Sequence, residues 1–178
     1  MGRDVTATSE MKKKVLSSRI EAGALLPYLD LPSNRNVTVN LWDFKQKKNL
    51  VIIFHHGIGC NDCRRKLREL TEIYGKAKDL EAEFLAVSFD SPAEGIKQGE
   101  EDKLPFPLLS DLDGAATGRF THVNVARKAP YSSIFISDRF GVLRYQKIAE
   151  EAGELPAGKE ILDWLLLIEC ECPECSHL

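Results

Sequence analysis

Residues 49–63 read NLVIIFHHGIGCNDC and contain both an apolar run and a pair of cysteines. Its first six residues are almost wholly apolar and rich in β-branched side chains, which is typical of a strand covered on both faces in a mainly parallel sheet. Beyond the glycines, apolar residues recur at helical spacing from Leu67 to Leu80. The pattern therefore predicts a strand-to-helix turn that places Cys60 and Cys63 at or near the helix N-terminus.

The flanking sequence extends this unit into an α/β domain. Short alternating or apolar runs predict further strands, Asp90 or Ser91 is a good helix cap, and a late amphipathic segment predicts a final helix. The expected strands and the final helix occupy, in chain order, residues 37–41, 83–89, 133–137, 142–146 and 156–168. We predict a central mixed sheet flanked by helices, with an N-terminal strand extension and a late hairpin.

A chain of 178 residues with 43% hydrophobic content is long enough to bury one core, so we predict one folded domain. Residues 1–22 are polar and charged and are interpreted as an N-terminal arm. Residues 23–168 form the predicted domain, and residues 169–178 form a cysteine-rich tail.

Composition excludes several classes of function. The net charge of −3 provides no overall basic field for nucleic acid or an anionic membrane. Residues 1–18 lack the apolar core of a secretory signal, and the apolar run at residues 161–168 is far shorter than the roughly 20 residues of a membrane span. We expect a cytoplasmic protein whose five cysteines are reduced thiols, a redox pair or metal ligands.

The cysteine pair predicts thiol redox chemistry. A thiol reacts as its thiolate, which the amides and the dipole at a helix N-terminus stabilise, so Cys60 is the predicted nucleophile. Cys63, one helical turn further, can resolve a mixed disulfide or condense with a sulfenic acid on Cys60. The alternatives are a chance pair of buried cysteines and half of a metal site. We also expect positive charge near the sulfur from four neighbours: Arg64, Arg65, Lys66 and Arg68.

Two histidines precede the pair. An imidazole at this point can accept a proton from Cys60, because histidine titrates near neutrality. We expect His55 to fill the strand end. For His56, a role as proton acceptor and a solvent-facing position both stay open.

The chain resembles the alkyl hydroperoxide reductase/thiol-specific antioxidant branch of the thioredoxin superfamily, the redoxins or peroxiredoxin-like proteins, from about Leu25 to Gln146. Three segments carry the resemblance: residues 51–70, 106–114 and 134–141. It implies a thioredoxin-like fold and a thiol-dependent antioxidant enzyme with its nucleophile at position 60. The implied substrate is a peroxide or a protein disulfide, the reductant is of the thioredoxin type, and thiol exchange requires no cofactor. Relatives often self-associate, so the resemblance is compatible with a homodimer.

The chain departs from the family pattern near the cysteines. Peroxiredoxins carry a P-x-x-x-T-x-x-C motif, and here Ile53 and Gly57 stand at the proline and threonine positions. The C-x-x-C spacing favours thiol–disulfide exchange beside peroxide reduction. Thioredoxin-like folds also keep a cis-proline that faces the cysteine pair. Pro130 is the candidate for this role, and the alternative is that Ser132 occupies the facing position.

The C-terminal tail packs four soft or borderline ligands into eight residues: Cys170, Cys172, Cys175 and His177. We predict that these residues form a second dithiol that relays electrons to Cys60 and Cys63. The alternative is a zinc or iron–sulfur site on a thioredoxin-like scaffold, and an inert tail is the third interpretation.

Overall fold

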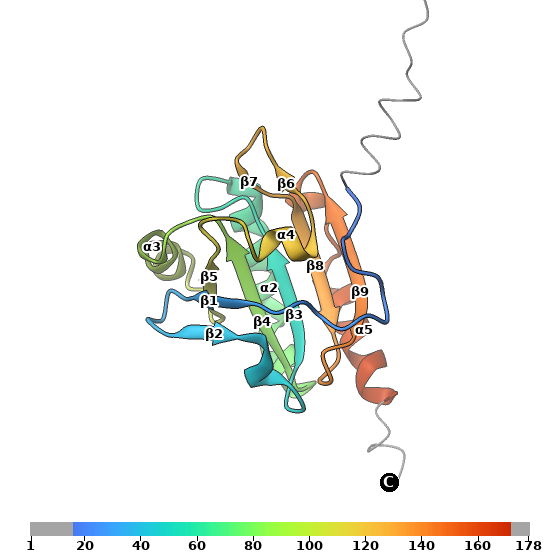
Figure 1. The fold of residues 1–178 in the computed structure, drawn as a ribbon. Coiled ribbons are helices and arrows are strands. Elements are labelled where there is room, and N and C mark those ends of the chain that lie inside the picture. The colour runs from blue at the N-terminus through green and yellow to red at the C-terminus, as the bar shows by residue number, and fades with distance from the viewer. Residues whose placement is uncertain (1–15, 172–178) are drawn as a thin grey trace, which may run out of the picture.

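The computed structural model describes residues 16–171. At its centre lies a five-stranded mixed sheet in the order β5-β4-β3-β8-β9 (Figure 1). The strands in this order are Leu108–Ser110, Ala82–Ser88, Asn49–Phe54, Ser132–Ser137 and Leu143–Ala149. Because β3 pairs in parallel with β4 and antiparallel with β8, it is the middle strand of the domain.

Every residue of β3 is buried, as the apolar run predicts. Side chains of a strand alternate between the faces of a sheet, so a strand that is apolar throughout needs cover on both faces. Val51 and Ile53 pack into one core, while Ile52 and Phe54 pack into a second core on the opposite face. The sheet therefore forms the middle of three layers.

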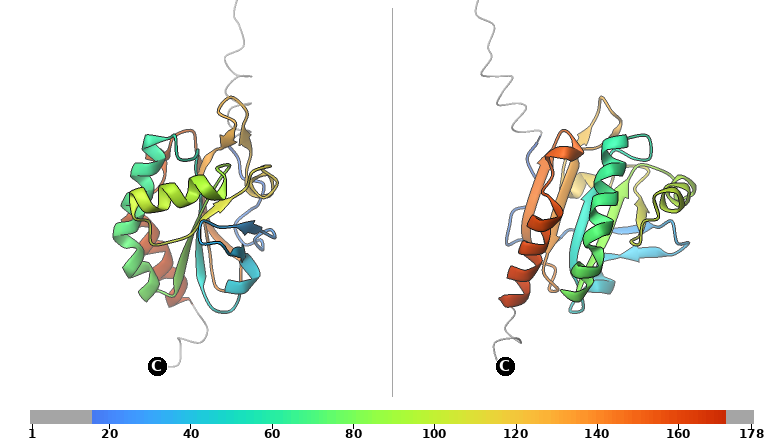
Figure 2. Two further views of the ribbon diagram at one scale, coloured as in Figure 1. Left: turned by 90° about the vertical axis from the view of Figure 1, so that its left-hand side faces the viewer. Right: turned by 180° about the vertical axis from the view of Figure 1, so that it is seen from behind.

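Two helices cover the first face: α2 (Asn61–Asp79) and α5 (Gly158–Cys170). They lie side by side in the right-hand view of Figure 2. Leu67 and Leu70 of α2 and Ile161 and Leu165 of α5 are buried in the same core as Val51. The predicted final helix is confirmed. A short helical turn, η2 (Ala152–Glu154), precedes it.

The opposite face is covered by the N-terminal segments and α4 (Thr117–Phe120). β1 (Asp30–Pro32) and β2 (Thr38–Asn40) form a separate antiparallel pair, followed by η1 (Leu41–Phe44). The predicted N-terminal strand extension is therefore present. The described part of the predicted N-terminal arm lies against the domain, because the Arg19 amide donates to the Phe120 carbonyl at 2.9 Å.

The remaining elements place loops around the cysteine pair. α3 (Pro92–Asp102) begins at Ser91, whose hydroxyl accepts from the Glu94 amide in a reciprocal capping box, so Ser91 is the cap. β6 (Val123–Asn124) and β7 (Ala129–Pro130) form a small hairpin near the N-terminus of α2 (Figure 1). Within residues 16–171, no helix has the length and apolar character needed to cross a membrane.

Candidate active site

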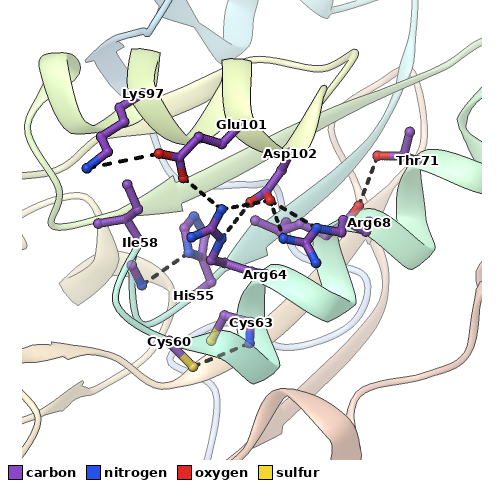
Figure 3. Close-up of polar contacts among 12 residues, drawn as sticks. His55, Ile58, Cys60, Cys63, Arg64, Arg68, Thr71, Lys97, Glu101 and Asp102 are labelled. Carbon is purple, nitrogen blue, oxygen red and sulfur yellow. Dashed lines mark hydrogen bonds and ion pairs between the residues drawn. The ribbon is translucent and has the colours of Figure 1, made fainter.

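Cys60 is the N-cap residue of α2, as the sequence predicts. Its backbone is extended, and its sulfur accepts a hydrogen bond from the Cys63 amide at 3.3 Å (Figure 3). The first amides of a helix have no partner within the helix, so they are available to a negatively charged group at the cap. The Cys60 sulfur lies where a thiolate is stabilised.

Cys63 is the protected member of the pair. It is buried whereas Cys60 is half-buried, and both are free thiols. Burial, together with a hydrogen bond that the Cys63 thiol donates to Cys60, raises the pKa of Cys63 to about 12. Both sulfurs and a His56 ring nitrogen lie within 4.8 Å of one another. The geometry thus separates an accessible thiol from a second thiol that stays protonated beside it.

His56 faces the Cys60 sulfur rather than solvent alone. Its Nδ1 lies 3.6 Å from Cys60 Sγ and 3.0 Å from a guanidinium nitrogen of Arg127, and its Nε2 lies 3.4 Å from Ser132 Oγ. A guanidinium can only donate, so Nδ1 accepts and the ring proton is on Nε2. The unprotonated nitrogen of His56 therefore lies beside the nucleophilic thiol and accepts from Arg127.

The surroundings keep this imidazole neutral. Burial lowers the pKa of His56, the positive charge of Arg127 lowers it further, and Glu151 opposes both effects. Arg127 itself pairs with Glu151. A neutral imidazole beside a thiol can accept its proton, so the position of His56 is compatible with the proton-acceptor role.

Sequence patterns did not single out Arg127. It lies in the turn between β6 and β7 and is 71 residues from His56 along the chain. The four cations of α2 that were expected to supply charge near Cys60 are paired with carboxylates, which offset their charge. Arg64 and Arg68 both bind Asp102 of α3, whose side chain is fully buried (Figure 3). Arg65 and Lys66 pair with acids one turn away on α2.

His55 fills the end of β3, as expected. It is buried, and its Nδ1 accepts a hydrogen bond from the Gly57 amide at 3.1 Å. Burial, helped by the neighbouring His56, lowers the pKa of His55 to about 3. His55 can therefore accept this hydrogen bond, which holds the loop that carries Cys60, only while its own ring is neutral.

This burial predicts a stability that depends on pH. The unfolded chain protonates His55 near its ordinary pKa of about 6.5, whereas the folded protein resists protonation down to about pH 3. The free energy of unfolding should therefore fall as the pH falls through this window, by up to about 1.4 kcal/mol per pH unit. Above this pH window, His55 is neutral in both the folded and the unfolded state, so it adds no pH dependence to the free energy of unfolding.

Urea unfolding between about pH 7 and pH 4 measures this effect, because that range covers most of the window. His55→Asn is the matched control, since its amide oxygen can still accept from the Gly57 amide but does not titrate. The variant should show a shallower dependence on pH than the unmodified protein. Equal slopes for the two proteins would contradict the assignment.

The profile of the AhpC/TSA family matches residues 22–146. The chain belongs to the AhpC/TSA family. It is 25% identical over 138 residues to a putative peroxiredoxin, ycf42, of Trieres chinensis, covering 74% of this chain and 65% of that protein. It is 26% identical over 103 residues to peroxiredoxin bcp1 of Schizosaccharomyces pombe, covering 58% and 53%. Alkyl hydroperoxide reductase E of Mycobacterium bovis is 23% identical over 138 residues, with 76% and 90% covered.

Solved structures agree on the fold of this AhpC/TSA member. The AhpC of Enterococcus faecalis superposes with a TM-score of 0.78 at 19% identity, covering 88% of this chain and 97% of that one. Peroxidoxin BcpB of Mycobacterium tuberculosis gives a TM-score of 0.73 at 15% identity, with 85% and 98% covered. The predicted family and the predicted thioredoxin-like fold are both confirmed. The chain spans about two thirds and about half of the first two curated relatives, respectively.

The structure explains why residue 57 is glycine where the AhpC/TSA pattern has threonine. Gly57 has a φ of +106°, and a Cβ built on it would lie 2.7 Å from a carboxylate oxygen of Asp90. Asp90 accepts hydrogen bonds from the Ile58 amide at 2.9 Å and from the Ser88 hydroxyl at 2.8 Å. Burial raises the pKa of Asp90. This carboxylate thus fills the space beside residue 57 and anchors the loop.

Ser132 occupies the position that faces the cysteine pair. Its hydroxyl lies 4.0 Å from Cys63 Sγ, while Pro130 pairs with Val123 in the β6–β7 hairpin. None of the peptide bonds within residues 16–171 is cis, so the expected cis-proline at position 130 is wrong. The start of β8 explains the difference. β8 begins at Ser132, two residues after Pro130, and this places Ser132 opposite the Cys63 sulfur.

The described part of the predicted relay lies far from the cysteine pair. Cys170 is an exposed free thiol at the end of α5, and the preceding Glu169 accepts from the Asn49 side chain at the start of β3. Cys60 follows the opposite end of β3, so about 20 Å separate the two regions, at roughly 3.3 Å per strand residue. Three members of the predicted cluster lie outside the described residues: Cys172, Cys175 and His177.

Proposed function

We propose that the protein is a thiol-dependent peroxide reductase in which Cys60 is the nucleophile and Cys63 the resolving cysteine. One observation carries the proposal: the accessible N-cap thiol of Cys60 lies 3.6 Å from the unprotonated nitrogen of His56, with a buried second thiol one turn away. Membership of the AhpC/TSA family supports the same chemistry.

In the first step, Arg127 releases Nδ1 of His56, the proton of the Cys60 thiol moves to this nitrogen, and the thiolate attacks one oxygen of a hydroperoxide. The O–O bond breaks, Cys60 becomes a sulfenic acid, and the leaving oxygen takes the proton back from His56 as water or an alcohol. Arg127, which donates to Nδ1 in the resting site, is then free to place its cation where the leaving oxygen gains negative charge.

In the second step, Cys63 attacks the sulfenic sulfur of Cys60. A disulfide forms, and the displaced hydroxide combines with the proton of Cys63 as water. The raised pKa keeps Cys63 protonated until this point, so Cys60 remains the thiol that reacts first. A thioredoxin-type dithiol then supplies two electrons and two protons to restore both thiols. This cycle uses no cofactor.

A second candidate function is thiol–disulfide exchange on a protein substrate. It is favoured by the C-x-x-C spacing across the first turn of α2. Here Cys60 attacks a substrate disulfide, the mixed disulfide forms at Cys60, and Cys63 releases the reduced substrate as the Cys60–Cys63 disulfide forms. Self-association as a homodimer and a cytoplasmic location remain predictions from the sequence.

The test is a single turnover without reductant, followed by alkylation and peptide mass spectrometry. One equivalent of hydrogen peroxide should convert the reduced protein to the Cys60–Cys63 disulfide, and Cys63→Ser should accumulate one added oxygen on Cys60. Cys170→Ser is the matched control and should behave as the unmodified protein. If peroxide leaves Cys60 reduced while a disulfide substrate is trapped on Cys63→Ser, exchange replaces peroxide reduction as the function.

A further inference from the structure

We propose that the reduced form of this site also binds a Zn²⁺ ion, through His56, Cys60 and Cys63. These residues place one ring nitrogen and two sulfurs within 4.8 Å of one another. Two thiolates and an imidazole are ligands that Zn²⁺ prefers, and three protein ligands with one open position is an arrangement known from zinc sites. This site is separate from the tail cluster suggested by the sequence.

The distances fit a tetrahedral ion with little movement. Bonds of about 2.3 Å to sulfur and about 2.0–2.1 Å to nitrogen place a sulfur and a nitrogen ligand about 3.6 Å apart. Cys60 Sγ and His56 Nδ1 are 3.6 Å apart in the structure. Cys63 Sγ lies near enough to complete the set, and partial exposure of Cys60 and His56 leaves the fourth position toward solvent.

The surroundings of His56 include the outer partner that zinc-bound histidines usually have. Such a histidine donates its other ring N–H to a nearby acceptor, which fixes the tautomer and the ring orientation. Here Nε2 faces the Ser132 hydroxyl at 3.4 Å, so Nδ1 is the ring nitrogen on the side of Cys60. Ser132 thereby orients His56 as a ligand.

Arg127 is the group that opposes the ion. Its guanidinium donates to Nδ1, so zinc must displace that contact, and its positive charge repels a cation. Its side chain is 43% exposed and is already paired with Glu151, so it can withdraw toward that carboxylate. The residue that assists peroxide reduction is therefore the one that weakens zinc binding.

Zinc binding and catalysis exclude each other, because both require the same two sulfurs. Bound zinc should inhibit the reaction, and oxidation should release it. With hydrogen peroxide, two zinc-bound thiolates lose two electrons and form the Cys60–Cys63 disulfide, while the peroxide takes these electrons and two protons to give two waters. The oxidative release of zinc rests on the proposed function, whereas zinc binding does not.

The first experiment titrates reduced, metal-free full-length protein with Zn²⁺ by calorimetry and with Co²⁺ by absorption, since thiolate-bound tetrahedral cobalt has strong charge-transfer bands. One equivalent should bind. Cys60→Ser should lose the site while its fold, checked by circular dichroism, is kept. The matched control replaces Cys170, Cys172 and Cys175 together by serine and should bind as the unmodified protein. His56→Ala should weaken binding by more than roughly the 10- to 100-fold that losing an outer-shell partner costs.

Arg127→Gln gives a second, independent readout. It should bind Zn²⁺ several-fold more tightly and reduce peroxide more slowly, a pair of opposite changes that simple damage to the fold would not produce. Binding that survives Cys60→Ser, or is lost in the triple tail variant, would move the ion to the tail and overturn the proposal. Absence of any binding would also overturn it, while peroxide turnover, measured separately in metal-free buffer, tests the proposed function alone.

Discussion

Replacing Cys60 by serine is expected to lower the rate of peroxide reduction by more than roughly 10³-fold, the scale seen when a covalent nucleophile is removed. A serine hydroxyl at the same cap position cannot accept oxygen from a peroxide and then form a disulfide. The stability of the protein should change little, because serine is a preferred N-cap residue and can accept from the Cys63 amide as the sulfur does. Consumption of hydrogen peroxide in a thioredoxin-coupled assay measures the rate, and urea unfolding measures the stability.

Cys63→Ser is the informative comparison. It should keep the first oxidation of Cys60 but stop sustained turnover with a thioredoxin-type reductant, because the sulfenic acid has no resolving partner. The two variants thus separate attack from resolution. Sustained turnover by Cys60→Ser would show that another thiol, such as Cys170, is the nucleophile.

Gly57→Thr is expected to destabilise the protein by roughly 2–6 kcal/mol, although it restores the residue that the family pattern has at this position. A non-glycine residue at the φ of +106° costs about 1–3 kcal/mol, and forcing extra atoms into a packed site costs about as much again. The added atoms meet the Asp90 carboxylate, which also anchors the Ile58 amide. Peroxide reduction should fall as well, because the loop holds both His56 and Cys60.

Gly59→Ala is the control for this change. Gly59 is two residues away in the same loop, its φ lies outside the left-handed region, and an added Cβ there meets no atom within 4 Å. Its stability should change by less than about 0.5 kcal/mol, as for most surface substitutions. If urea unfolding gave equal stabilities for Gly57→Thr and Gly59→Ala, the steric explanation for the missing threonine would be wrong.

The local features of the fold could be predicted from the sequence. β3 occupies the predicted residues, because a short apolar, β-branched run between polar residues has few other ways to bury its side chains. The N-terminal position of Cys60 on α2 follows from the same stretch, as the helical spacing begins directly after it. The β8–β9 hairpin also lies close to its predicted limits.

The contacts between distant segments could not be predicted in this way. Arg127 contacts His56 from a turn that has no periodic sequence pattern. Asp102, which lies on another helix, forms an ion pair with Arg64. The choice between Pro130 and Ser132 depended on where β8 begins, and a shift of one residue would reverse the face to which each side chain points. No sequence pattern suggested Arg127 or Asp102, and only the packing of α3 and the β6–β7 hairpin brings them to their partners.

The place of Cys170 at the far end of α5 decides the kinetic order of any exchange that this thiol enters. About 20 Å of packed protein separate Cys170 from the cysteine pair, whereas a disulfide joins residues whose Cα atoms are no more than about 7 Å apart. With α5 intact, Cys170 can therefore exchange with the Cys60–Cys63 disulfide only of another copy. Between separate copies this exchange is bimolecular, so its rate per active site should double when the protein concentration is doubled and should approach zero on dilution, while the chemistry within one site proceeds at the same rate in both conditions.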